Sequence, residues 1–165
     1  MKKAFTMIEL IFVIVILGIL AAVALPKFLG VAQQAHEANL KSFVGTLNRS
    51  AGPSIWSKAI STNGTGSVNA LTGADQNLST YVDIPKEFAQ TDANLTADCN
   101  DSTQYTVILT APASKAGKDY VVACEDGTAN HSLQFRLYRT TGTVGSTTFD
   151  DNETTNCIAG PGCNE

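Results

Sequence analysis

The sequence predicts an α+β protein in which a long N-terminal helix packs on a small antiparallel β-sheet. Three observations predict this fold. An apolar run extends from Phe5 to Leu25, and an amphipathic pattern with helical spacing continues from it to Ala51. After residue 100, short segments alternate between apolar and polar residues, which is typical of strands.

The apolar run carries a single charge, the carboxylate of Glu9. The run is long enough to cross a bilayer, which takes about 20 apolar residues. An acid inside such a segment is costly in lipid, so we expect Glu9 to be functional and to have a partner. A secretory signal peptide cut within residues 21–24 and a plain membrane anchor are the alternatives. Glu9 argues against the first, because the apolar cores of signal peptides avoid acids.

Pro26 lies inside the helical pattern and predicts a bend, since proline removes a backbone hydrogen bond. Beyond it, apolar residues at spacings of three and four form one face of the helix: Leu40, Phe43, Val44, Leu47 and Ala51. Gly52-Pro53 interrupts this pattern. We favour a kinked helix that continues to about Ile60 over a short second helix with Pro53 in its first turn.

The head of the protein follows the helix. Residues 62–80 are rich in Gly, Asn, Ser and Thr and are predicted to be a loop. Four strands are predicted: Tyr81–Ile84, Gln104–Thr110, Tyr120–Cys124 and His131–Tyr138. The first has the weakest pattern, and a turn at residues 125–128 makes the last two an antiparallel pair. The tail from Thr140 shows no periodicity.

The head contains all four cysteines: Cys99, Cys124, Cys157 and Cys163. Four cysteines allow three connectivities. We favour Cys99–Cys124, which ties two regions of the sheet, and Cys157–Cys163, which closes a short glycine-containing loop and tethers the tail. Zinc is disfavoured because no close Cys-x-x-Cys pair with His partners is present.

The charge and the remaining polar residues restrict the function. The net charge is −4, and residues 53–165 carry six basic and thirteen acidic side chains. An acidic head repels phosphates, so we predict no contact with nucleic acid. His36 and His131 belong to no hydrolase or metal motif, and no catalytic constellation is visible. We therefore expect neither enzymatic activity nor a cofactor.

Two further candidate sites lie in the head. Three acidic residues offer oxygen ligands for calcium: Asp150, Asp151 and Glu153. A solvated acidic loop is the simpler interpretation of this cluster. Three Asn-x-Ser/Thr triplets have an aspartate two positions before the asparagine: those at Asn94, Asn100 and Asn152. The longer pattern resembles the bacterial N-glycosylation acceptor, although chance explains it more simply.

The first residues, MKKA followed by FTMIEL, resemble the N-terminus of type IV prepilins and of the related type II secretion pseudopilins. The shared pattern is a short basic leader, a small residue at the cleavage site, then Phe, three further residues and Glu, followed by the apolar run. Here Ala4 stands where the family usually has glycine. The likeness is close over about residues 1–30 and extends as helix to about residue 60.

This resemblance implies that a prepilin peptidase cleaves between Ala4 and Phe5 and methylates the new amine of Phe5. Glu9 would then attract the amine of a neighbouring Phe5, because opposite buried charges tolerate each other better than either alone. Gly18 and Pro26 match a family glycine and proline, and the helix between them is expected to loosen in a filament. The other implied partners are an inner-membrane assembly platform, a cytoplasmic ATPase and, for a pilus, an outer-membrane secretin.

The chain is accordingly divided into four parts: a leader peptide (1–4), a membrane and filament-core half-helix (5–25), an amphipathic half-helix (26–61) and a β head (62–165). We expect a pilin-like fold and a homo-oligomeric helical filament that serves adhesion, motility, uptake or secretion. Before assembly the chain crosses the inner membrane once with a periplasmic head, and afterwards it lies in a surface pilus or a periplasmic pseudopilus. The alternatives are a type II secretion pseudopilin and an anchored periplasmic binding protein that never polymerises.

Overall fold

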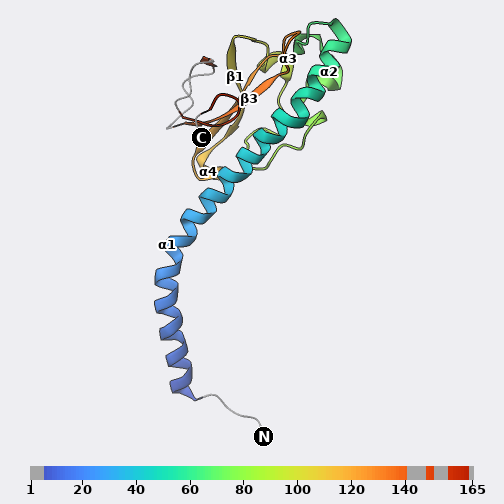
Figure 1. The fold of residues 1–165 in the computed structure, drawn as a ribbon. Coiled ribbons are helices and arrows are strands. Elements are labelled where there is room, and N and C mark those ends of the chain that lie inside the picture. Colours follow the sequence, from blue (N-terminus) through green and yellow to red (C-terminus); the bar gives the residue numbers. More distant parts are fainter. Residues whose placement is uncertain (1–5, 141–147, 151–155, 164–165) are drawn as a thin grey trace. The chain divides into compact units, whose positions relative to one another are not determined.

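The computed structural model describes residues 6–140, 148–150 and 156–163, with the backbone alone at 26–29 and 148–150. The chain divides into two units, residues 1–35 and residues 36–165. Helix α1 (Met7–Thr46) contributes to both. A π-helical segment, η1 (Leu47–Ala51), joins it to helix α2 (Gly52–Asn63). In Figure 1 these helices run from blue to green, and the strands of the head follow in yellow to red.

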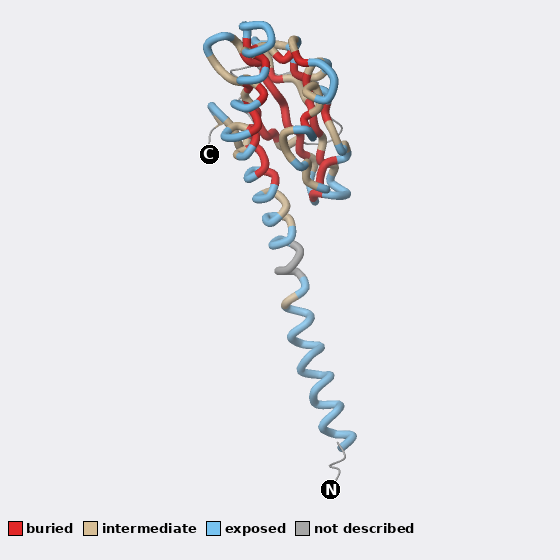
Figure 2. The backbone as a smooth tube through the Cα atoms, turned by 90° about the vertical axis from the view of Figure 1, so that its right-hand side faces the viewer, coloured by how far each residue is buried: buried red, intermediate tan, exposed pale blue. Residues whose placement is uncertain are grey.

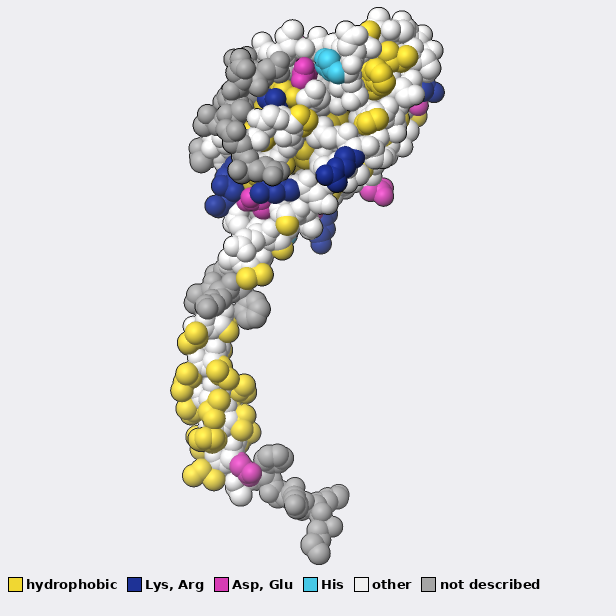
Figure 3. All heavy atoms as spheres, viewed as in Figure 1, with side chains coloured by type: hydrophobic (Ala, Val, Ile, Leu, Met, Phe, Trp, Pro, Cys, Tyr) yellow, Lys and Arg dark blue, Asp and Glu magenta, His cyan; other side chains and the backbone are white. Residues whose placement is uncertain are grey.

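In the first unit, α1 exposes apolar side chains on every side. The segment Met7–Leu25 is long and apolar enough to cross a membrane. Ile16 is the least exposed of its large apolar side chains and still presents 41% of its surface. Figure 3 shows hydrophobic side chains covering this part of the helix. An apolar surface of this extent requires lipid or protein to cover it.

In the second unit, the helix acquires a buried face. The predicted stripe is confirmed, since its five residues are at most 6% exposed. It continues into α2 through Ile55 and Ala59, both fully buried. Figure 2 shows the buried residues of this helix on the side that faces the strands. Spacings of three and four residues place these side chains on one face, as the sequence indicates.

The helix continues past Gly52-Pro53, as we favoured, through the π-helical segment, and Pro53 lies in the first turn of α2. It ends at Asn63, where Gly64 takes a left-handed φ of 74°. Asn48 ties η1 to strand β3 (Gln134–Thr140): its amide donates to the Phe135 carbonyl and accepts from the Phe135 N–H, both at 2.9 Å. Gly52 permits this close approach, because a Cβ there would lie 3.1 Å from the Leu133 carbonyl oxygen.

Among the residues described, five antiparallel strands form one sheet in the order β4-β1-β2-β3-β5. Strands β1 (Gln104–Ala111), β2 (Asp119–Glu125) and β3 confirm three of the four predictions, and β2 pairs with β3 as expected. β3 begins later than predicted, because the His131 carbonyl accepts the Thr128 N–H in the preceding turn. The edge strands β4 (Thr148–Asp150) and β5 (Cys157–Ala159) lie in the tail, where no strand was predicted.

The connection between α2 and β1 contains only short elements. They are the 3-10 turns η2 (Val68–Ala70), η3 (Gly73–Gln76) and η4 (Leu78–Thr80), and helix α3 (Leu95–Asp98). A similar helix, α4 (Ala113–Ala116), joins β1 to β2. The prediction of a strand at Tyr81–Ile84 is wrong. The N–H groups of Tyr81 and Val82 both donate to the Leu78 carbonyl, so this segment forms a turn.

Apolar side chains cover both faces of the sheet. The main core lies between the helices and the sheet and includes Leu47, Phe88 and Phe135. A smaller cluster contains Tyr105, Val121, Ala123, Tyr138 and Cys157. Because Cys157 belongs to the tail, the tail completes this second cluster. The architecture is the predicted α+β fold, with a helix on an antiparallel sheet.

Candidate functional site

A capping box closes the N-terminal end of α1. The Glu9 carboxylate accepts hydrogen bonds from the Thr6 backbone N–H (3.2 Å) and from the Thr6 hydroxyl (3.1 Å). In return, the Thr6 hydroxyl oxygen accepts the Glu9 N–H at 3.4 Å. Both residues are exposed. The lone carboxylate of the apolar segment therefore has a partner in its own chain.

Sequence reasoning overlooked Thr6, although a Thr-x-x-Glu pattern ahead of an apolar run is a known signal for a helix start. Ala4 and Phe5 lie outside the described residues, so cleavage and methylation there stay predictions. Gly18 has open space where a Cβ would stand. The backbone of α1 is helical through Pro26. Loosening of the helix between these two residues also stays a prediction.

In the head, Glu37 of α1 connects the helix to the sheet. Its carboxylate accepts hydrogen bonds from Arg139 of β3 (2.7 Å) and Tyr120 of β2 (3.0 Å), and lies 3.2 Å from the ammonium of Lys41. Burial by itself raises the pKa of Glu37, but these hydrogen bonds outweigh burial and lower the pKa below its ordinary value. The hydrogen bond to Glu37 raises the pKa of Arg139 in turn.

A second carboxylate, Glu87, is only 5% exposed and lies against the same helix. Its oxygen is 3.3 Å from His36 Nδ1 and 3.5 Å from Asn39 Nδ2. Burial raises the pKa of Glu87, but a backbone N–H and these two side chains outweigh burial and lower the pKa. His131 instead contacts the Ser132 carbonyl. Within the described ranges, no three His, Cys, Asp or Glu side chains form a group that could hold a metal ion.

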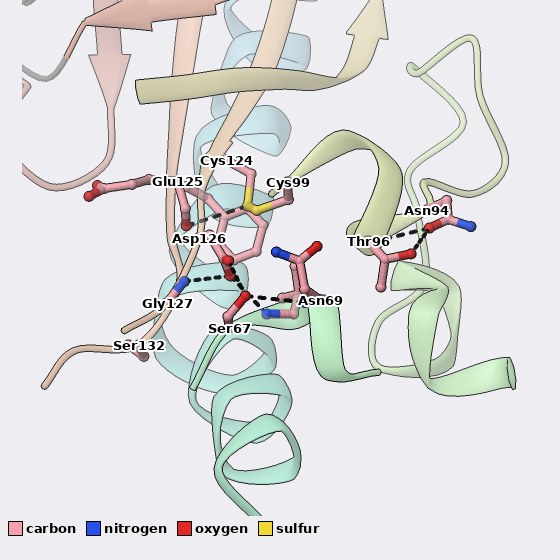
Figure 4. The surroundings of a disulfide bond; sticks show 12 residues. Ser67, Asn69, Asn94, Thr96, Cys99, Cys124, Glu125, Asp126, Gly127 and Ser132 are labelled. Carbon is pink, nitrogen blue, oxygen red and sulfur yellow. Dashed lines mark hydrogen bonds between the residues drawn. A yellow bond between two sulfur atoms is a disulfide. The ribbon is translucent and has the colours of Figure 1, made fainter. Parts of the chain in front are cut away.

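The disulfides in the structure are Cys99–Cys124 and Cys157–Cys163, which is the pairing favoured above. The first is fully buried and joins the end of α3 to β2. Asp126 lies close to it (Figure 4). This residue accepts hydrogen bonds from the Ser67 hydroxyl (2.6 Å) and from the N–H groups of Gly127 (2.7 Å) and Val68 (2.9 Å). Burial raises the pKa of Asp126 despite these bonds.

The second disulfide closes the tail loop beside Arg136 of β3. The Arg136 guanidinium stacks 4.0 Å from the centre of the Tyr105 ring, and its Nε donates to the Pro161 carbonyl at 2.6 Å. Gly160 has a φ of 121°, and a Cβ there would collide with the Phe135 carbonyl oxygen. The Arg136 guanidinium therefore holds the tail loop on the sheet, and Gly160 allows the loop to approach β3 closely.

A hollow of about 630 Å³ lies between the helix and this tail loop, and its charged lining residues are Lys41 and Arg49. The other described residues of its lining are uncharged. The calcium site predicted at residues 150–153 stays a prediction. Asp151 and Glu153 lie outside the described residues, and only the backbone of Asp150 is described.

Comparison with known proteins identifies the N-terminal segment. Residues 1–25 match the family described as the prokaryotic N-terminal methylation motif. The type IV narrow pilus major component PilA5 of Thermus thermophilus is 55% identical over 38 residues, which make up 23% of this chain and 33% of that protein. No solved structure matches.

The described part of the chain thus forms an α+β fold with one helix apolar enough to span a membrane. These findings confirm the resemblance of the N-terminal segment to the type IV pilin family. The similarity to PilA5 covers only a third of that relative's length.

Proposed function

We propose that this chain is the structural subunit of a type IV pilus or a related filament, and that it polymerises through the apolar half of α1. One observation carries the proposal: Met7–Leu25 is apolar and exposed on all sides, yet it bears one acid at its start. A soluble protein does not leave such a surface uncovered. Lipid covers it before assembly, and identical helices of neighbouring subunits cover it afterwards.

Glu9 supports a specific contact between subunits. In the single chain its carboxylate is held by neutral donors of Thr6. Removal of residues 1–4 leaves an α-amine on Phe5, which is mostly protonated at neutral pH because such amines titrate near pH ~8. A charged amine from a neighbour is a stronger partner than a neutral N–H or hydroxyl. The pair fixes the register of one helix against the next.

The remaining steps follow from the same family resemblance. A prepilin peptidase cleaves between Ala4 and Phe5 and methylates Phe5. An assembly platform and a cytoplasmic ATPase lift the subunit out of the inner membrane, while the helix loosens between Gly18 and Pro26. The two disulfides are consistent with a head in the periplasm or outside the cell, where thiols are oxidised.

A type II secretion pseudopilin is the second candidate, because the same N-terminal motif serves both filaments. The tethered C-terminal loop favours the pilus. A binding protein that never polymerises would need an apolar cleft. The hollow beside the tail carries Lys41 and Arg49, whereas a second hollow is lined in part by Phe43, Val82 and Pro85.

The substitution Glu9→Gln tests the proposal. Glutamine keeps the size of the side chain and can still complete the capping box, but it removes the charge. We expect sheared fibres of the unaltered protein to contain chains that begin at N-methylated Phe5. The variant should reduce the number of fibres by a factor of about ten or more. The reason is that the protonated amine of Phe5 would then be buried among apolar helices without a partner, which costs several kcal/mol. Electron microscopy and mass spectrometry measure both quantities.

Thr6→Val is the matched control, since it disturbs the capping box and leaves the charge of Glu9 in place. Fibres should persist in this variant. Wild-type levels of fibres from Glu9→Gln would contradict the proposed role of the charge. A native chain that begins at Met1, or beyond Ala24, would contradict the proposed processing and assembly.

A further inference from the structure

The connection between η4 and α3 carries an acceptor pattern for sugar, Asp92-Ala93-Asn94-Leu95-Thr96. We propose that Asn94 is N-glycosylated on its side-chain nitrogen, Nδ2. The inference rests on the proposed function in one respect, namely that the head is exported across the inner membrane. The pattern has the Asn-x-Thr triplet that acceptors require and the additional acid two positions earlier.

The pattern occurs more often than chance explains. A fourth copy, Asp75-Gln76-Asn77-Leu78-Ser79, joins the three at Asn94, Asn100 and Asn152. A chain with this content of acidic, Asn, Ser and Thr residues would contain the pattern less than once if its residues were shuffled. Asn77 and Asn94 also pair across an antiparallel bridge, so two copies meet in space. Four copies of the complete pattern are therefore not explained by the composition of the chain alone.

Asn94 has the geometry that the modification needs. Its side chain is exposed and caps α3: Oδ1 accepts the N–H groups of Thr96 (3.1 Å) and Ala97 (3.2 Å) and the hydroxyl of Thr96 (2.8 Å). Nδ2 makes no hydrogen bond within the part of the chain that the structure describes. Figure 4 shows this nitrogen pointing away from Thr96. A glycan on Nδ2 therefore leaves every bond of the cap intact.

The other copies are less suited to the modification. Asn77 is half-buried. Asn100 is exposed, but Ser102, not threonine, follows two positions later, and the pair caps no helix. Asn152 lies outside the described residues. Only Asn94 combines exposure, a bonded threonine hydroxyl and a free amide nitrogen among the asparagines that are described.

Asp92 is an anion held in a fixed position beside the acceptor. Its Oδ1 accepts the N–H groups of Ser79 (2.9 Å) and Ala93 (2.8 Å). Burial raises the pKa of Asp92, but these hydrogen bonds outweigh burial and lower it, so the carboxylate is charged at neutral pH. A transferase with a cationic subsite for this residue would therefore meet a negative charge in a defined place.

The transfer needs one co-reactant, an oligosaccharide joined to a lipid through pyrophosphate. Nδ2 attacks C1 of the first sugar and forms the N–C1 bond. The bond between C1 and the pyrophosphate oxygen breaks, and the lipid pyrophosphate leaves with the electron pair. Nδ2 gives up one proton to a base of the transferase. The step is a substitution at C1 and needs no oxidant or reductant.

Intact-mass measurement and peptide mapping of the native full-length chain test the proposal. The variant Asn94→Asp keeps a good N-cap and removes the acceptor nitrogen. We expect a glycan on the Asn94 peptide of the unaltered protein and its complete loss in Asn94→Asp. Thr96→Val should also abolish the glycan, and Asp92→Asn should lower the occupied fraction several-fold.

Asn63→Asp is the matched control. Asn63-Gly64-Thr65 is an exposed triplet in which the Asn63 Oδ1 also accepts the N–H two residues on, at 2.9 Å, but Ser61 stands at the acidic position. This variant should keep the glycan on Asn94. A glycan found on Asn63 of the unaltered protein would contradict the role of Asp92.

An unmodified mass for the native chain, or a glycan that survives in Asn94→Asp, overturns the proposal. The cysteines in the same sample distinguish the two possible failures. Oxidised cysteines without a glycan reject glycosylation and leave export standing. Reduced cysteines without a glycan reject export and glycosylation together. Fibre counts for Asn94→Asp report separately on filament assembly.

Discussion

At the scale of single residues, two glycines with nearly equal left-handed φ angles have different surroundings. Gly64 and Gly66 take φ values of 74° and 76°. A Cβ on Gly64 would stand in open space, whereas a Cβ on Gly66 would collide with the Thr128 carbonyl oxygen and lie 2.5 Å from Trp56 Nε1. Trp56 donates to that same carbonyl at 2.7 Å. Gly66 is therefore required for both conformation and space, and Gly64 for conformation alone.

Replacement of each glycine by alanine should separate these two requirements. Gly64→Ala should cost about 1–2 kcal/mol, the penalty of a left-handed residue with a Cβ. Gly66→Ala should cost about 1–3 kcal/mol more, because it also separates Trp56 from its acceptor. Trp56 is the one tryptophan of the chain, so its fluorescence during urea unfolding in detergent follows both variants. Equal losses would show that the contact with Thr128 contributes nothing.

At the scale of secondary-structure elements, the two disulfides tie segments of very different length. Cys99 and Cys124 are 25 residues apart and connect α3 to β2. Cys157 and Cys163 are only 6 residues apart and form a local loop. The entropy that a cross-link removes from the unfolded chain grows with the length of the loop that it closes.

Removal of each disulfide by a pair of alanines should therefore have unequal effects. The chain-entropy relation gives about 3.5 kcal/mol for the longer loop and about 2.4 kcal/mol for the shorter one. The Cys99→Ala/Cys124→Ala protein should accordingly have the lower melting temperature. Calorimetry of both variants measures the difference. The reverse order would show that the local tail loop matters more than the entropy of the unfolded state.

The elements that the sequence predicts well are those with a local signal. The stripe on α1 and strands β1, β2 and β3 follow from periodicity. The edge strands β4 and β5 are three residues each and form only because partners lie far away in the sequence. The contact of Asn48 with Phe135 spans 87 residues and has no local signature. Tyr81–Ile84 has strand-forming residues, but the bonds to Leu78 make it a turn.

The features of the candidate sites also differ in how far the sequence predicts them. Thr6 and the fourth acceptor pattern at Asn77 are visible in the sequence as short motifs. The collection of side chains around Glu37 is not visible in the sequence, since it depends on segments 83 and 102 residues away. Short motifs indicate which residues to examine, and the fold decides which of them are accessible.

At the scale of the whole molecule, carboxylates as well as the apolar core join the helix to the rest of the head: Glu37 joins it to the sheet, and Glu87 joins it to the connection before α3. Glu37 and Glu87 both have pKa values below their ordinary value of 4.5. The unfolded chain consequently binds more protons than the folded chain at acidic pH. Asp126 acts with the opposite sign, because burial raises its pKa from 3.8.

The stability of the head should therefore fall in acid. The contribution of Glu37 and Glu87 is complete above pH 4.5 and is lost as the pH falls through their lower folded values. In Glu37→Gln, the free energy of unfolding should be lower at neutral pH and should depend less steeply on pH below 4.5. Urea midpoints at a series of pH values measure this slope. An unchanged slope in the variant would contradict the role of the ion pair.

The outermost strands of the sheet, β4 and β5, are three residues each. Unpaired backbone on a long, flat edge invites a second sheet to join it and leads to aggregation. Chains anchored in one bilayer accumulate side by side at high local concentration, which makes that hazard greater. With such short edge strands, heads that are brought together as the proposed function requires can crowd and still remain separate molecules.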